Sequence, residues 1–402
     1  MTSRERILAA LSHEPVDRVP IDFGGTRQSG ISVFSYARLR KYLGCDPARL
    51  CRVFDVFQML AEIEPVIAER LGSDCVALNR RAVAFGLPNE NWRSFRLPTG
   101  LEVEVPGAFN PVEGEDGALT LMREGQAIAV MPAGGFYFDR LEKHPGALHV
   151  DLDAWSPPRL TPADLDHFHR ESLRLYRETD RAIVAAMGPP YELFYGLGQG
   201  DFNAWMTTLA SEPDYVRGLY RKLVDVWIEN LEAFHGAVGD QVQVLQICDD
   251  FGTQRAPFLS VRMFRDLVLP AYKRGLDWVH QNTSWKVMLH SDGAIAPLLP
   301  SIIEMGVDIL NPVQTTAAGM DPDYLKRTFG ASLVFWGGSC DSQGTLAHGT
   351  PGQVAAETAR NLEAFSRQSG FVCASIHNIQ ADVPPENIVA LFDTALQHPT
   401  RP

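Results

Sequence analysis

Short apolar runs alternate with longer amphipathic segments along most of the chain, most regularly from residue 162 onward. Apolar residues recur every three or four positions in the longer segments, which predicts helices, whereas the short runs are typical of buried strands. The predicted strands are 182–187, 241–247, 285–290, 308–313, 332–337 and 370–376. The predicted helices are 163–178, 201–210, 213–236, 260–281, 295–305, 321–329, 351–369 and 384–397. Strands joined by helices form a parallel sheet, because the chain must cross back between neighbouring strands.

The N-terminal part adds two strands to this series. Residues 20–23 and 74–78 form short apolar runs, and helices are predicted at 3–12, 32–43 and 55–71. Eight strand–helix units in one chain favour a closed (β/α)8 TIM barrel, here a single domain over residues 1–402, rather than an open doubly wound sheet. No glycine-rich nucleotide motif follows a strand, which weighs against nucleotide-binding folds.

The pattern changes between residues 81 and 150. Residues 95–105 alternate around a Pro-Thr-Gly turn, and the runs 118–122 and 127–131 flank a polar turn. Alternation with short polar turns predicts antiparallel hairpins. We therefore predict an antiparallel β insertion at about 81–150, in the N-terminal third of the barrel.

Composition narrows the classes of function. The 402-residue chain has a net charge of −13 and no cluster of Lys and Arg, which argues against nucleic-acid binding. Its charged beginning is unlike a signal peptide, and no apolar run reaches membrane-spanning length, so we expect a cytoplasmic protein. The six cysteines are scattered without a C-x-x-C pair, as in proteins with reduced thiols.

Polar residues follow several predicted strands, where the active site of a TIM barrel is built. His290 and Asp292 are two positions apart, so in extended backbone they point to the same side. With His377 they form a candidate two-histidine, one-carboxylate site for zinc or another divalent metal. Two alternatives stay open, namely that Asp292 caps the following helix and that His377 is a hydrogen-bonded loop residue.

Further strand ends supply candidate catalytic and substrate-binding residues. Asp249 and Asp250 are adjacent and point to opposite sides, so at most one of them faces the barrel mouth, and with His290 they are the candidate catalytic residues. Cys340 is either a nucleophile or a small filler. The candidate substrate-binding residues are Tyr191, Phe194, Gln246, Asn311 and Gln314. The aromatic ones suit either a pocket wall or a packed loop.

On these motifs the chain resembles the uroporphyrinogen decarboxylase superfamily, which includes cobalamin-dependent methyltransferases of the coenzyme M and O-demethylase types. The resemblance implies a (β/α)8 barrel. The similar stretches run nearly from end to end and are Arg4–Leu11 with Pro15–Pro20, Asp249–Gln254, Leu289–Gly293, Gly306–Gln314 and Val383–Ile388.

Two departures from the family pattern bear on function. Zinc-dependent methyltransferases of this group carry His-x-Cys and a later Cys. Here His290 matches the histidine, while Asp292 and His377 stand at the cysteines, so a thiolate-rich site is lost. The decarboxylase pattern Arg-Gln-Ala-Gly-Arg is echoed by residues 27–30 without its second arginine, which argues against true decarboxylase activity.

The resemblance implies a methyltransferase that moves a methyl group between a small substrate or carrier and cobalamin. The sequence has no Asp-x-His-x-x-Gly stretch, so the cobalamin is expected on a separate corrinoid protein. The expected partners are the corrinoid protein and a small-molecule methyl donor or acceptor. A homodimer is a further expectation. The alternatives are a lyase or decarboxylase acting on a carboxylated aromatic or tetrapyrrole-like substrate, and a barrel that binds a small ligand without turnover.

Overall fold

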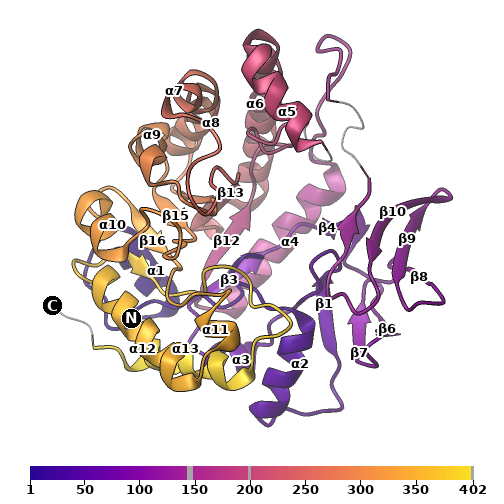
Figure 1. Ribbon diagram of the computed structural model, residues 1–402, viewed down its shortest axis with the longest axis vertical. Helices are drawn as coiled ribbons and strands as arrows, with labels where there is room; N and C mark the ends of the chain where they lie inside the picture. The colour runs from indigo at the N-terminus through magenta and orange to yellow at the C-terminus, as the bar shows by residue number, and fades with distance from the viewer. Residues whose placement is uncertain (143–147, 198–200, 400–402) are drawn as a thin grey trace.

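The computed structural model describes residues 1–142, 148–197 and 201–399. Its centre is a curled sheet of seven parallel strands, each of which pairs with its neighbours in chain order (Figure 1). The strands are β3 (Cys75–Leu78), β12 (Ala182–Ala186), β13 (Val244–Cys248), β14 (Lys286–His290), β15 (Ile309–Asn311), β16 (Val334–Trp336) and β17 (Phe371–Val372). All seven lie within or next to strands that the apolar runs predict.

The segment around Ile21 joins the two edges of this sheet. Ile21 forms a parallel bridge with Cys373, just beyond β17, and its carbonyl accepts a hydrogen bond of 2.7 Å from the backbone N–H of Asp74, just before β3. The predicted strand 20–23 therefore occupies the eighth position. The prediction of a TIM-barrel fold with antiparallel strands in its N-terminal part is confirmed.

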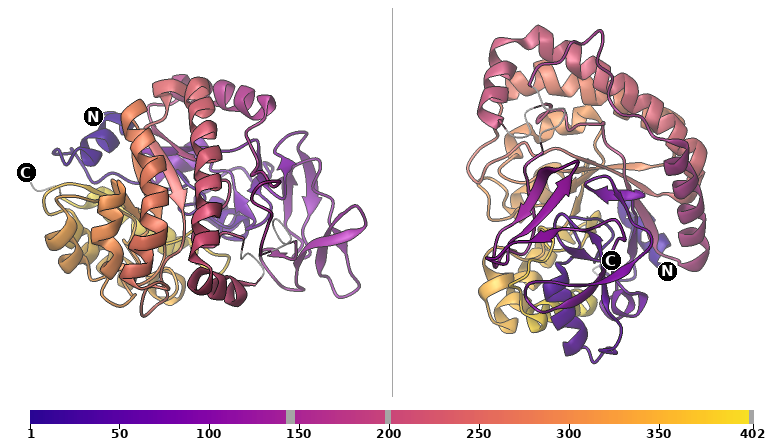
Figure 2. Two further views of the ribbon diagram at one scale, coloured as in Figure 1. Left: turned by 90° about the horizontal axis from the view of Figure 1, so that it is seen from above. Right: turned by 90° about the vertical axis from the view of Figure 1, so that its right-hand side faces the viewer.

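Helices surround the sheet, as the views in Figure 2 show. The longer ones are α1 (Ser3–Leu11), α2 (Val33–Tyr42), α4 (Pro162–Glu178), α5 (Phe202–Ser211), α6 (Pro213–Val238), α8 (Leu269–Asn282), α10 (Pro322–Phe329), α12 (Pro351–Phe365) and α13 (Pro385–Gln397). Shorter ones are α3 (Pro65–Arg70), α7 (Val261–Met263), α9 (Leu299–Met305), α11 (Thr345–His348), the 3₁₀ turns η1 (Gly239–Gln241) and η3 (Ala296–Leu298), and the π-helical η2 (Phe264–Val268). No helix in the described ranges is long and apolar enough to cross a membrane.

The barrel interior has an apolar floor. Alternate residues of the strands point inward and form one buried cluster, which includes Val184, Val244, Met288 and Ile309. Ile7 of α1 belongs to the same cluster, so α1 closes the amino-terminal end of the barrel. The next inward positions along the strands are polar, and this change places chemistry at the carboxyl ends of the strands.

The strands outside the barrel lie together on the right of Figure 1, and they pair antiparallel except for β1 and β7, which are parallel. They form the sheets β2-β1-β7-β6 and β11-β10-β9-β8 and the pair β4-β5. Their bounds are β1 (Cys51–Asp55), β2 (Leu60–Ala61), β4 (Ala82–Ala84), β5 (Leu87–Pro88), β6 (Arg93–Arg96), β7 (Glu102–Val105), β8 (Val112–Glu113), β9 (Leu119–Arg123), β10 (Gln126–Met131) and β11 (Asp139–Arg140). Residues 143–147 of the predicted insertion lie outside the described residues.

The prediction of a helix over 55–71 is wrong in its first half. Residues 51–61 form β1 and β2, and a helix, α3, begins at Pro65. The cause is local, because the Asp55 carboxylate accepts hydrogen bonds from the backbone N–H groups of Phe57 (2.9 Å) and Gln58 (3.2 Å). This turn competes with a helical start and sends the chain back antiparallel to β1. The antiparallel part therefore includes residues before 81.

Candidate functional site

His290 ends β14 and points into the barrel, where it is 4% exposed. Its Nδ1 lies 2.7 Å from Asn311 Oδ1, and Asn311 Nδ2 donates to the Trp336 carbonyl at 3.1 Å. Since the amide nitrogen is used on a carbonyl, Asn311 presents its oxygen to the ring, and Nδ1 of His290 carries the proton. The lone pair of His290 is therefore on Nε2.

Asp292 is placed by a turn that requires glycine beside it. Gly293 has φ of +91°, and a Cβ there would lie 2.5 Å from the backbone of Gly252. The N–H of Gly293 donates to Gln314 Oε1 at 2.8 Å, and the N–H of Asp292 donates to Asp250 Oδ1 at 2.9 Å. These bonds fix the backbone that carries the Asp292 carboxylate, so Gln314 supports the turn.

His377 follows β17 and is held like His290. Its Nδ1 lies 3.1 Å from Asn378 Oδ1, and Asn378 Nδ2 donates to Gln58 Oε1 at 2.7 Å. The amide oxygen of Asn378 thus faces the imidazole and leaves the lone pair on Nε2. Burial and the neighbouring His290 lower the pKa of His377, which favours its neutral form.

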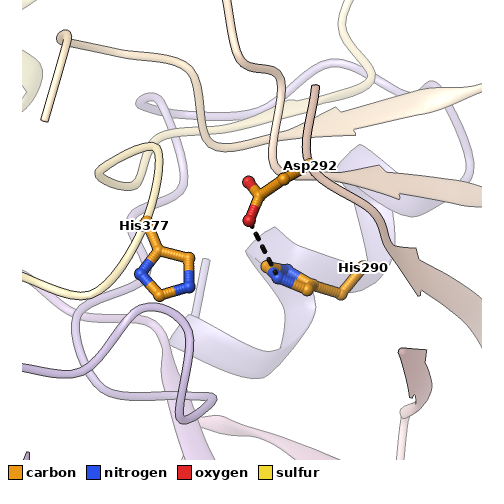
Figure 3. Close-up of side chains that lie close together, drawn as sticks. All are labelled: His290, Asp292 and His377. Atoms are coloured by element: carbon orange, nitrogen blue, oxygen red, sulfur yellow. Dashed lines mark ion pairs between the residues drawn. The ribbon is translucent and has the colours of Figure 1, made fainter. Parts of the chain in front are cut away.

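These three side chains converge (Figure 3). One ligand atom from each of His290, Asp292 and His377 lies within 4.8 Å of the others, and His290 Nε2 is 3.8 Å from Asp292 Oδ2. Two imidazoles oriented by amide oxygens and one carboxylate form a donor set that suits a divalent metal. The convergence predicted from the sequence is present in the structure.

The two adjacent acids occupy different surroundings. Asp249 is 1% exposed, and its Oδ2 accepts from the backbone N–H of Phe194 at 2.7 Å and from the Tyr272 hydroxyl at 2.8 Å. Burial raises the pKa of Asp249 well above its usual range. Asp250 is half-buried, and its carboxylate accepts the hydrogen bond from the backbone N–H of Asp292. Asp250 thus lies beside the cluster, whereas Asp249 anchors the loop after β12.

A cavity of about 230 Å³ adjoins this cluster, at the carboxyl ends of β3, β12 and β13. Its polar lining includes Arg27, Asn79, Arg80, Glu192, Gln246 and Cys248. Cys248 is the Cα partner of His290 on the neighbouring strand, which brings the cavity next to the cluster, although His290, Asp292 and His377 are not among its lining residues.

The predicted substrate-binding residues therefore separate into groups. Gln246 lines the cavity. Asn311 and Gln314 orient His290 and Gly293 through the bonds described above. Phe194 is fully buried with its ring stacked on Phe258, and Tyr191 packs near Trp155, so neither belongs to the described cavity lining. The packed-loop alternative describes these two aromatic residues better than a pocket wall.

Three of the cavity residues that the sequence predictions missed are Arg80, Glu192 and Cys248. Arg80 lies two positions after the predicted strand 74–78. Glu192 lies in the segment after β12, from which only the aromatic residues Tyr191 and Phe194 were predicted to bind substrate. Burial and Asp250 raise the pKa of Glu192 to about 7, against the opposing effect of Arg27. Cys248 also ends a strand. Polar residues at strand ends were the available signal for all three.

A barrel with a polar cluster at the carboxyl ends of its strands defines an enzyme-type architecture. The uroporphyrinogen decarboxylase (URO-D) family model matches residues 142–398. The match covers more than half of the chain, and the protein belongs to this family. A search of curated proteins finds no match.

Solved structures agree with the fold. A methyltransferase from Methanosarcina mazei superposes with a TM-score of 0.62 at 18% identity, covering 99% of both chains. At this identity the similarity shows the fold alone. A galacturonate dehydratase mutant from Geobacillus (TM-score 0.26, 11% identity, 60% of both chains) and a homocysteine methyltransferase from Escherichia coli (0.21, 11%, 58% of this chain and 86% of that one) are too distant to support an argument.

Proposed function

We propose that the protein is a methyltransferase that moves a methyl group between a small substrate or carrier and a corrinoid held by a separate protein. The observation that carries the proposal is the convergence of His290, Asp292 and His377, with both imidazole Nε2 lone pairs available beside one carboxylate. Family membership and the fold shared with the Methanosarcina mazei methyltransferase support it.

The cluster fits a zinc ion or another divalent metal. His290 and His377 would bind through Nε2 and Asp292 through a carboxylate oxygen, which replaces the thiolates of the family pattern with a harder ligand set. When bound, the metal would supply a Lewis acid for the heteroatom that the methyl group leaves or joins. The hydrogen bonds that the Nδ1–H groups donate to the amide oxygens of Asn311 and Asn378 hold both rings in the tautomer that this role needs.

The acids beside the cluster can manage the accompanying proton. When a methyl group leaves a substrate heteroatom for a nucleophilic corrinoid, both electrons of the broken bond stay on the heteroatom, which then takes a proton. Asp250 and Glu192 are the carboxyl groups nearest to this role, and the pKa of about 7 lets Glu192 carry a proton at neutral pH. In the reverse direction the same groups accept the proton.

A spectral assay tests this proposal. The protein is mixed with cob(I)alamin and methoxylated, methylamine-type, thioether or methyltetrahydrofolate donors, and methylation of the corrinoid is followed by absorbance. We expect turnover with a donor, its loss in His290→Ala, and its retention in His280→Ala, a partly exposed histidine bonded to the Gly306 carbonyl. Absence of corrinoid methylation with every donor class would count against the proposal.

A decarboxylase is the second candidate, because Arg80 faces the cavity without a carboxylate partner in the described part of the chain and could hold a carboxylated substrate. The same reaction mixtures distinguish the two. Release of CO2 in the absence of corrinoid would favour the decarboxylase, whereas corrinoid-dependent consumption of the donor without CO2 favours methyl transfer.

A further inference from the structure

The cavity next to the cluster contains hydrogen-bond donors that lack acceptors. It has room for a small molecule rather than a single water. Its lining includes the aliphatic residues Leu78, Val83 and Val184 and the polar residues Arg27, Arg80 and Gln246. A site with apolar walls and a few convergent polar groups is typical of small-ligand binding.

The two arginines of the cavity differ in their partners. Arg27 forms an ion pair with Asp55, with Nη2 to Oδ2 at 2.5 Å. Arg80 has no carboxylate within ion-pair distance anywhere in residues 1–142, 148–197 and 201–399, and its contact is with Met187 Sδ at 3.8 Å. Desolvation and the charge of Arg27 lower the pKa of Arg80, whereas the charge of Asp164 opposes them, and the residue keeps part of its surface open to solvent.

Gln246 gives a second, independent indication. Its side chain is 2% exposed, and its Nε2 has no hydrogen-bond partner among the described residues. A buried amide donor without an acceptor destabilises a protein unless a ligand or water satisfies it. Arg80 follows the end of β3, Gln246 lies on β13, and both line the same cavity.

We propose that this cavity binds the carboxylate of the substrate through Arg80 and Gln246, so that the substrate is a small carboxylic acid carrying the methyl-bearing heteroatom at its other end. The planar guanidinium matches a carboxylate through two parallel hydrogen bonds, and the Gln246 amide adds a third donor. Glu192 in its protonated form does not repel such an anion.

The placement of the cavity fits this orientation. Cys248 lines the cavity and pairs with His290 across β13 and β14, and Asp250 is electrostatically linked to Glu192 while it holds Asp292. A substrate anchored at Arg80 therefore extends its other end toward the cluster. This step rests on the proposed function, whereas carboxylate binding itself does not require the corrinoid.

Direct binding tests the inference. Isothermal titration calorimetry compares 4-methoxybenzoate and methoxyacetate with their neutral amides, using wild type, Arg80→Gln and Arg81→Gln. Arg81 is the adjacent residue, half-buried and paired with Glu90 at 3.3 Å, and serves as the matched control. We expect at least one carboxylate to bind better than its amide, with a loss of at least about tenfold in Arg80→Gln and no change in Arg81→Gln.

Several outcomes overturn the inference. They are equal binding of acids and amides, equal affinity in the two arginine variants, and competition by inorganic phosphate or sulfate as tight as the carboxylate. Arg80→Lys, which keeps the charge but loses the paired donors, should weaken binding by a smaller factor and provides a second variant if Arg80→Gln misfolds. Intact carboxylate binding without methyl transfer would contradict the proposed function alone.

Discussion

Two sides of the barrel mouth differ in how far the hydrogen-bonding groups of their side chains are satisfied. On the side of β14 and the loop after β17, His290 and His377 each have their Nδ1 held by an amide oxygen, and the Asp292 turn is fixed by two backbone hydrogen bonds. On the side of β3 and β13, Gln246 Nε2 has no hydrogen-bond partner among the described residues, and Arg80 contacts Met187 Sδ but forms no ion pair with a described carboxylate.

The difference indicates which component each side receives. Preorganised lone pairs with satisfied supporting groups suit a resident ion, because a metal site needs its ligands oriented before binding. Unpaired donors around a cavity suit a ligand that comes and goes and brings the acceptor with it. Asp250 accepts a hydrogen bond from the Asp292 backbone and acts electrostatically on Glu192, which lines the cavity, so these two acids connect the sides, and the proposed methyl transfer would exchange its proton there.

The largest expected effect tests the preorganised side. Protein purified without chelator should contain zinc or another divalent ion by elemental analysis, and His290→Ala should lose it. Removing a ligand costs more than the roughly 10–100-fold in metal affinity typical of removing its supporting partner. His280→Ala should keep the metal content of the wild type. A wild type that neither contains nor takes up zinc would leave this side as a polar substrate site, similar in kind to the other.

Asp249 and Asp250 test whether a catalytic role is confined to the acid beside the cluster. Asp250→Asn should lower turnover by roughly 10²-fold, the scale of lost general acid–base help. Asp249→Asn should keep most of its turnover, because one amide oxygen can still accept from Phe194 and Tyr272 as Asp249 Oδ2 does. Steady-state kinetics with matched thermal melting curves checks both. Equal near-wild-type rates would show that both acids act structurally.

The sequence predicts the fold and the preorganised side well, for physical reasons. Short continuous apolar runs between amphipathic segments identify the strands, and spacing by two places His290 and Asp292 on one face. His377 is far away in sequence, and the closure of the barrel brings it to the same mouth. Topology and local spacing therefore suffice for this cluster.

The other side depends on pairings that local patterns do not reveal. Arg27 and Arg80 both follow N-terminal strand segments, and what distinguishes them is Asp55, which reaches Arg27 from β1. The predicted helix over 55–71 gives no reason to expect the Arg27–Asp55 ion pair. The turn that places Asp55 depends on hydrogen bonds of its carboxylate, which the apolar spacing does not predict. An unpaired cation is a property of three-dimensional surroundings rather than of spacing.

The smallest expected effect concerns pH and connects the two sides through Glu192. Its pKa of about 7 lies above the ordinary value, so Glu192 is neutral below pH 7 and ionised above it. The charged and titratable groups around it are Arg27, Tyr195, Cys248, Asp249, Asp250 and Tyr272. Ionised Glu192 adds a negative charge beside a bound carboxylate, so the affinity for 4-methoxybenzoate should be level below pH 7 and fall by about threefold to tenfold between pH 7 and 8.

Glu192→Gln isolates this effect, because the amide keeps the shape of the protonated acid and cannot ionise. Titration calorimetry from pH 5.5 to 8.5 should give a flat affinity profile in this variant, equal to that of the wild type at low pH, and tighter binding than the wild type at pH 8. An affinity that rises with pH in the wild type, or the same decline in both proteins, would mean that Glu192 does not face the bound carboxylate. The anion would then lie away from the acids that border the cluster.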